Sequence, residues 1–96
     1  MTPFSLNLVS SSLQLTLTSE ITIQHARELA DALKAILRPE HTLEIDASQL
    51  TRLDAAGLQV LLSVAQFASE TTLAASSAAW AEAFVRYASP DPFRTL

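Results

Sequence analysis

Two carboxylates, Asp46 and Asp54, have the residue type and spacing that could support chemistry. Asp46 ends a predicted strand, and Asp54 directly precedes a predicted helix. Paired carboxylates can act as a general acid and base or bind magnesium. The spacing lacks the further acids of a phospho-receiver pocket, however. The simpler interpretation is that Asp46 is the acid at the end of a strand and that Asp54 is a helix N-cap.

Other catalytic groups are sparse. The chain has no cysteine, which excludes thiolate catalysis and cysteine-ligated metals. His25 and His41 are far apart and have no metal-ligand spacing, so we expect both to be solvated. A single glycine cannot form a glycine-rich phosphate loop. We therefore expect no enzymatic activity, no metal site and no cofactor.

Composition limits the partners. The chain has 96 residues, 49% of them hydrophobic, and a net charge of −4, which indicates one globular domain over residues 1–96. Six basic residues spread along the chain do not form a basic face, so we expect no nucleic-acid binding. No apolar run is long enough to cross a bilayer, and no charged leader precedes Arg27. We therefore expect a cytoplasmic protein without direct membrane insertion.

The hydrophobic periodicity changes along the chain. Alternation of apolar and polar residues predicts strands at 4–9, 13–18, 42–46 and 72–76, the first two joined by a turn at 10–12. Helical periodicity predicts helices at 23–37, 55–69 and 78–88. The order β-β-α-β-α-β-α predicts an α/β domain with a mixed sheet of about four strands, parallel after residue 20. Because the strands alternate, helices should cover mainly one face.

The predicted helices have caps and apolar stripes. Thr22 and Ser77 are suitable N-caps for the first and third helices, and prolines follow the helix ends. The stripe of the first helix comprises Ala26, Leu29, Ala30, Leu33, Ile36 and Leu37. The stripe of the third comprises Trp80, Ala81, Phe84, Val85 and Ala88.

The lone glycine, Gly57, lies in the first turn of the second helix. Leu53 and Leu58 flank the Asp54 cap as a hydrophobic staple. Glycine inside a helix costs about 1 kcal/mol relative to alanine, so it must serve a purpose. One interpretation is tight packing against a neighbouring strand or loop. The other is close approach of a partner or phosphate to the helix N-terminus.

The stretch "LEIDASQLTRLDAAGLQVLL" resembles the signature of the STAS domain family (sulfate transporter and anti-sigma factor antagonist). The matching residues, in order and spacing, are Asp46, Ser48, Leu50, Leu53, Asp54, Gly57 and Leu58. The resemblance implies a small four-stranded sheet with helices that binds proteins and does not catalyse a reaction. It most closely suggests an anti-sigma factor antagonist in bacterial signal transduction by partner switching.

In such antagonists the residue before the glycine is usually a phosphoacceptor serine. The position here is Ala56, preceded by Ala55. Alanine has no oxygen to phosphorylate, so the resemblance implies that the usual switch is absent and that the binding-competent form persists. Phosphate would otherwise add about −1.5 to −2 charges beside Asp54.

Two other branches of the family are relevant. "AAGLQVLL" resembles STAS proteins that accompany bacterial chemotaxis kinases. The STAS subunit of lipid-asymmetry ABC transporters also has alanine before the glycine, but typically threonine one position earlier, where this chain has Ala55. The implied partner is an anti-sigma factor/serine kinase or a chemotaxis-type kinase, and the alternative is an ABC transporter ATPase.

The resemblance places docking at the loop and helix start over residues 47–58. The second helix has a second apolar face, Val60, Val64 and Phe67, which either packs under another layer, such as the third helix or the C-terminal tail, or contacts a partner. The expected contact residues are Ser48, Thr51, Arg52, Asp54, Ala55, Ala56, Gly57, Val60 and Val64. Ser48 could instead only cap its loop, and Arg52 could simply be solvated.

Overall fold

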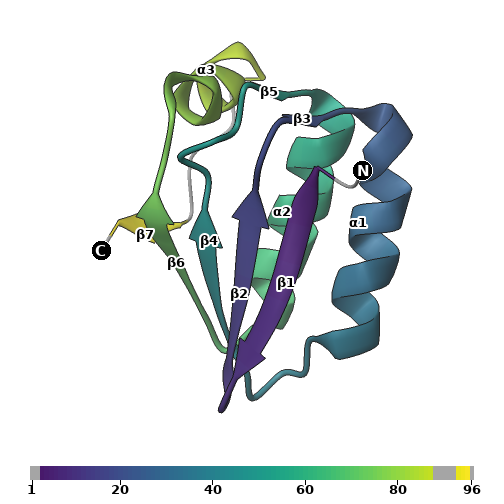
Figure 1. Cartoon of the computed structure of the whole chain (residues 1–96), viewed down its shortest axis with the longest axis vertical. Coiled ribbons are helices and arrows are strands. Elements are labelled where there is room, and N and C mark those ends of the chain that lie inside the picture. Colours follow the sequence, from purple (N-terminus) through teal and green to yellow (C-terminus); the bar gives the residue numbers. More distant parts are fainter. Residues whose placement is uncertain (1–2, 88–92, 96) are drawn as a thin grey trace.

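The first two strands form a hairpin in the computed structural model, which describes residues 3–87 and 93–95 (Figure 1). Strands β1 (Phe4–Val9) and β2 (Ser12–Leu17) pair antiparallel. In the turn, Ser10 has a φ of 55°, a left-handed conformation that serine adopts here in the absence of glycine. Leucines at alternate positions of β2 are fully buried, as period-two alternation predicts.

The main sheet has the order β1-β2-β4-β6-β7. Its other strands are β4 (Thr42–Asp46), β6 (Glu70–Ala75) and β7 (Arg94–Thr95), and the helices are α1 (Ile23–Ile36), α2 (Ala55–Phe67) and α3 (Ala78–Arg86). The pairs β2–β4, β4–β6 and β6–β7 are parallel. The predicted element order and mixed sheet of four principal strands are confirmed. The two-residue β7 is an addition that the sequence pattern did not predict.

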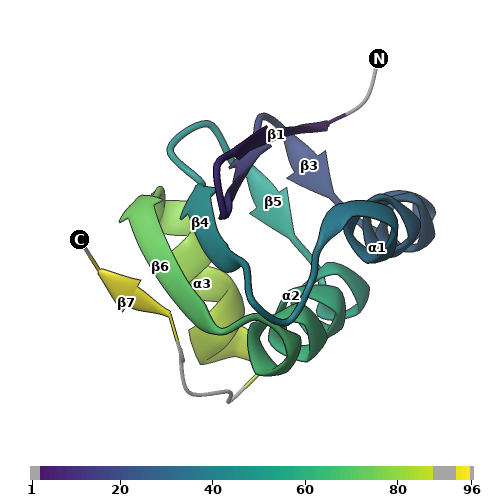
Figure 2. The same ribbon diagram turned by 90° about the horizontal axis from the view of Figure 1, so that it is seen from below.

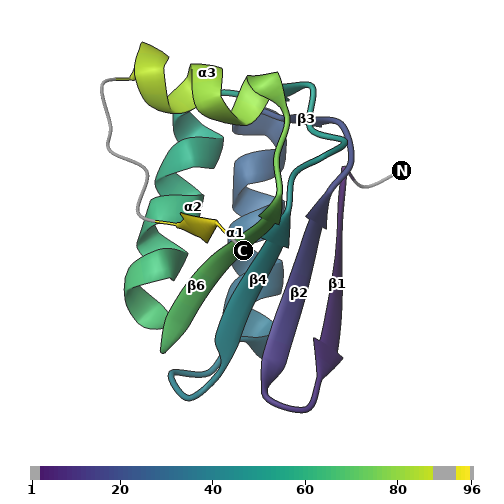
Figure 3. The same ribbon diagram turned by 90° about the vertical axis from the view of Figure 1, so that its left-hand side faces the viewer.

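The helices are arranged in two ways around this sheet. Helices α1 and α2 lie side by side on one face (Figure 2). Helix α3 crosses the end of the sheet toward which β4 and β6 run (Figure 3). The prediction that helices cover mainly one face is confirmed.

A second, two-stranded sheet joins two loops at the same end of the molecule. Strand β3 (Glu20–Ile21) pairs parallel with β5 (Arg52–Leu53). Each strand is only two residues long, too short for a period-two pattern to reveal it. The pairing places the start of α1 beside the start of α2.

The core is formed by leucine and isoleucine from β2, β4 and the helices. Two parts of the predicted stripes are wrong. Ile36 is 36% exposed, because α1 ends there and it is the next residue, Leu37, that turns into the core. In α3, Ala81 and Val85 are exposed, and small Ala83 faces inward instead, since α3 lies against the short strand β5. The predicted positions of Ala88, Pro90 and Pro92 lie outside the described residues.

Within residues 3–87 and 93–95, no helix is long and apolar enough to cross a membrane.

Candidate functional site

Asp54 caps two helices at once. Its Oδ1 accepts the backbone N–H of Gly57 in the first turn of α2, at 3.0 Å. Its Oδ2 accepts the N–H of Ile23, the first residue of α1, at 2.7 Å. The Asp54 N–H in turn donates to the carbonyl of Ile21 at 3.1 Å. Asp54 is therefore a helix cap, as predicted, and it also ties the start of α1 to the start of α2.

Gly57 is a packing glycine. A Cβ added there would lie 2.7 Å from Cγ2 of Ile21, 2.8 Å from Cδ1 of Leu53 and 3.0 Å from the carbonyl oxygen of Ile21. No side chain fits those distances, so the first turn of α2 packs directly on β3. The structure favours the interpretation that this glycine permits close packing against a strand.

Ala55 and Ala56 begin α2, immediately after the cap. Ala55 is exposed and Ala56 is half-buried. The carboxylate that fixes the helix start therefore also fixes the place where these two methyl groups reach the surface.

Ser48 and Asp46 form a small closed turn in the loop after β4. The hydroxyl of Ser48 donates to Oδ1 of Asp46 at 2.7 Å, and its backbone N–H donates to the same oxygen at 3.0 Å. These bonds hold the pKa of the Asp46 carboxyl below its ordinary value of 3.8, and the bond from the hydroxyl has the larger effect. Burial acts in the opposite direction and raises the pKa. Asp46 and Asp54 thus stabilise different segments and do not form a pair. Ser48 caps its own loop, which was the alternative to a contact with a partner.

Thr51 and Arg52 are both exposed at the edge of a shallow hollow between β5 and α3. The hollow measures about 320 Å³ and also includes Glu82 and Arg86. Thr51 is fixed by its N–H, which donates to the carbonyl of Ser19 at 3.0 Å. Thr51 and Arg52, two of the predicted contact residues, therefore reach the surface at the end of the molecule where β3, β5 and α3 meet (Figure 1).

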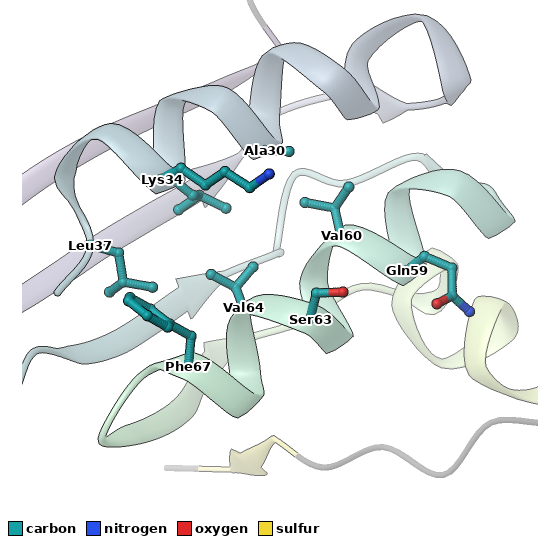
Figure 4. Close-up of a pocket in the computed structure, with 9 residues that line it drawn as sticks. Ala30, Lys34, Leu37, Gln59, Val60, Ser63, Val64 and Phe67 are labelled. Carbon is teal, nitrogen blue, oxygen red and sulfur yellow. The ribbon is translucent and has the colours of Figure 1, made fainter. Parts of the chain in front are cut away.

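The second apolar face of α2 borders a groove against α1. Val60 and Val64 are half-buried, and Phe67 is 50% exposed. The groove measures about 470 Å³, and its other wall comes from α1 residues such as Ala30 and Leu37 (Figure 4). The second apolar face of α2 is thus neither packed under another layer nor a flat surface. The sequence did not reveal that residues of α1 line this groove. The apolar stripe of α1 has the same pattern whether its edge is buried or exposed.

Of the C-terminal tail, which was one of the two possible covers for Phe67, the structure describes residues 93–95. Phe93 is buried, and its ring meets that of Trp80 at 5.3 Å between centroids and 70° between planes. Phe93 therefore packs against α3, and half of the Phe67 surface remains exposed.

The histidines are half-buried and not simply solvated. Nδ1 of His25 accepts the N–H of Thr22 at 3.3 Å, and Nδ1 of His41 accepts the N–H of Arg38 at 3.1 Å. Each closes a local turn at one end of α1. Among the described residues, no group of three or more His, Cys, Asp or Glu side chains could hold a metal ion.

Comparison with known proteins adds a family and a fold. The family model described as "Mlab, STAS domain" matches residues 4–89. No match was found among curated protein sequences. Among solved structures, an anti-sigma factor antagonist from Mycobacterium paratuberculosis aligns with a TM-score of 0.79 at 18% identity, over 96% of this chain and 82% of that one.

Two further solved structures have the same fold. The anti-sigma factor antagonist SpoIIAA in its unphosphorylated form aligns with a TM-score of 0.72 at 14% identity, over 97% of this chain and 86% of that one. An uncharacterized protein with a SpoIIAA-like fold from Shewanella loihica aligns with a TM-score of 0.52 at 17% identity, over 97% and 83%. At these identities the likeness concerns the fold.

Proposed function

The chain belongs to the STAS domain family, and on that premise we propose that it is a regulatory protein-binding module that acts as an anti-sigma factor antagonist does. STAS domains are regulatory, non-catalytic modules, and the fold matches two structures of such antagonists. The proposed partner is an anti-sigma factor that is also a serine kinase, or a chemotaxis-type kinase. The proposed compartment is the bacterial cytoplasm.

The observation that carries this proposal is the fixed presentation of Ala55 and Ala56. Asp54 is held by two backbone N–H groups, and Gly57 is packed on Ile21, so the helix start between them has little freedom to move. A docking surface that is rigid before binding loses less conformational entropy on association. The proposed contacts extend from this point to the exposed side chains of Ser48, Thr51 and Arg52, and along α2 to Val60 and Val64.

On this proposal, phosphorylation at position 56 does not control the docking surface, because the residue there is alanine. SpoIIAA is described in an unphosphorylated form, which makes phosphorylation a property of that protein. Ala56, the equivalent of the usual phosphoacceptor, has only a methyl group. We infer that the surface stays competent to bind, because no negative charge can be added at this position.

The test compares wild type with Ala56→Glu and with a matched control, Ala35→Glu. Ala35 is an exposed alanine near the far end of α1, so its substitution adds the same charge away from the proposed surface. Each purified, folded protein is used to capture partners from lysate of the native organism, and the partners are identified by mass spectrometry. The affinity for the partner identified is then measured with purified components.

We expect a histidine-kinase-like ATPase to bind wild type and Ala35→Glu and to bind Ala56→Glu at least tenfold more weakly. Capture of an ABC transporter ATPase with the same pattern would instead assign the chain to the transporter alternative. Equal binding by all three proteins would show that residues 47–58 are not the docking surface.

A further inference from the structure

The groove between α1 and α2 has the size of a small-molecule site. Its volume of about 470 Å³ is within the range of ligand pockets, which are typically about 300–1,000 Å³ and mostly apolar. The α2 wall runs from Gln59 to Phe67, which is about 12 Å at the rise of an α-helix. The groove is therefore about as long as two helical turns.

The lining of the groove is apolar apart from Lys34, Ser63 and Gln59 (Figure 4). Leu37 and the Phe67 ring lie together at one end, with Val64 next to them. Farther along, the Lys34 ammonium group points over the groove and Ser63 adds a hydroxyl, whereas the Gln59 amide points away from Lys34. Ala30 and Val60 lie beyond Lys34. A ligand that lies against Leu37 and Phe67 and also reaches Lys34 would combine an apolar tail with a polar head.

The charge of the groove specifies the sign of that head. Lys34 is the one charged residue among those that line the groove, and no residue of α2 is charged. Within residues 3–87 and 93–95, the Lys34 side chain has no ion pair and no hydrogen bond. A cation beside apolar walls, in a protein of net charge −4, is available to a ligand anion.

We propose that this groove binds an amphiphilic carboxylate of medium chain length, such as a fatty acid. The carboxylate pairs with the Lys34 ammonium group and accepts a hydrogen bond from the Ser63 hydroxyl. The alkyl tail lies along Val64 toward Leu37 and Phe67. One cation matches one carboxylate, whereas an acidic helix of a protein would find no cation on the α2 rim. The groove shares Val60 and Val64 with the proposed docking surface, and the inference is tested on the purified protein without a partner, so that either proposal can fail alone.

The test uses sodium decanoate, below its micelle concentration, as the probe. Backbone amide shifts of the isotopically labelled protein report where it binds, and titration gives the dissociation constant. Decyltrimethylammonium has a tail of the same length and the opposite charge. Lys34→Gln removes the cation and keeps most of the side-chain length, and Arg86→Gln makes the same charge change beside the hollow at α3.

We expect saturable decanoate binding with shifts concentrated at groove residues, about tenfold weaker in Lys34→Gln and unchanged in Arg86→Gln. Decyltrimethylammonium should bind at least tenfold more weakly than decanoate. The proposal is overturned if decanoate does not saturate, if the shifts lie elsewhere, or if either the head-group charge or Lys34→Gln has no effect. Absence of decanoate binding in a protein whose groove amides shift with a purified protein partner would assign the groove to protein docking instead.

Discussion

The carboxylate of Asp54 accepts the backbone N–H of Ile23 at 2.7 Å, although the two residues lie 31 positions apart. Its other oxygen accepts the N–H of Gly57 at 3.0 Å. One side chain thus satisfies donors at the starts of two helices, donors that have no partner within their own helices. The position of the proposed docking surface at the start of α2 therefore depends on α1.

Substitution of this carboxylate should destabilise the protein more than loss of a single cap. We expect Asp54→Ala to lower the free energy of unfolding by about 2 kcal/mol, since one N-cap is worth about 0.5–2 kcal/mol. Asp54→Asn should cost less, because its amide oxygen can still accept one N–H. Urea denaturation measures both, with Asp31→Ala, an exposed acid within α1, as the control. Equal stability of Asp54→Ala and Asp31→Ala would contradict the double cap.

Gly57→Ala should destabilise the protein although alanine is the better helix former. The added methyl would lie 2.7 Å from Cγ2 of Ile21 and 3.0 Å from its carbonyl oxygen, so β3 must move. Overpacking of this kind costs about 1–3 kcal/mol. Thermal unfolding measures the loss, and Gln66→Ala, at an exposed position of the same helix, should be close to neutral. A Gly57→Ala variant as stable as wild type would refute the packing role.

Ser48→Ala should raise the pKa of Asp46 toward its ordinary value of 3.8, because the hydroxyl bond is the largest cause of the lowering. A carboxyl with a lowered pKa in the folded state stabilises the protein above about pH 4, and this stabilisation is lost as pH falls through the folded pKa. The stability difference between wild type and Ser48→Ala should therefore be complete at neutral pH and shrink below about pH 4. NMR titration of the Asp46 carboxyl carbon measures the pKa. A titration midpoint that does not move in Ser48→Ala would disprove the role of the hydroxyl.

Phe93→Ala should detach the tail from α3. Phe93 is 5% exposed and packs edge-on against Trp80, so its truncation should cost about 3 kcal/mol. Trp80 is the only tryptophan, so its emission reports the contact and should shift to longer wavelength. Val85→Ala, at a side chain that is 81% exposed, is the control. Unchanged emission in Phe93→Ala would place the tail elsewhere.

Several features could be read from the sequence because their causes are local. The strands and helices follow from hydrophobic periods of two and 3.6 residues, which depend only on neighbours along the chain. The capping of α2 by Asp54 is equally local, since its carboxylate accepts the backbone N–H of Gly57, three positions later. The motif around Gly57 also indicated the family, which the match over residues 4–89 confirms.

Other features were decided by the tertiary structure. The β3–β5 pair is too short to have a pattern, and it places Ile21 against Gly57 and Ile23 against Asp54. Periodicity also could not predict that Ala83 would be buried and Val85 exposed, because that depends on where α3 meets β5.

The groove between α1 and α2 belongs to this second group. Each of its walls reads in the sequence as an ordinary apolar stripe. Whether such a stripe is covered depends on the distance and angle between two helices, and these are set by packing between residues about 30 positions apart in the chain. The sequence alone therefore determined the four principal strands, the three helices and the family motif around Gly57. Only the tertiary structure determined what Gly57 contacts, which second helix Asp54 caps, and that a groove remains open beside Lys34.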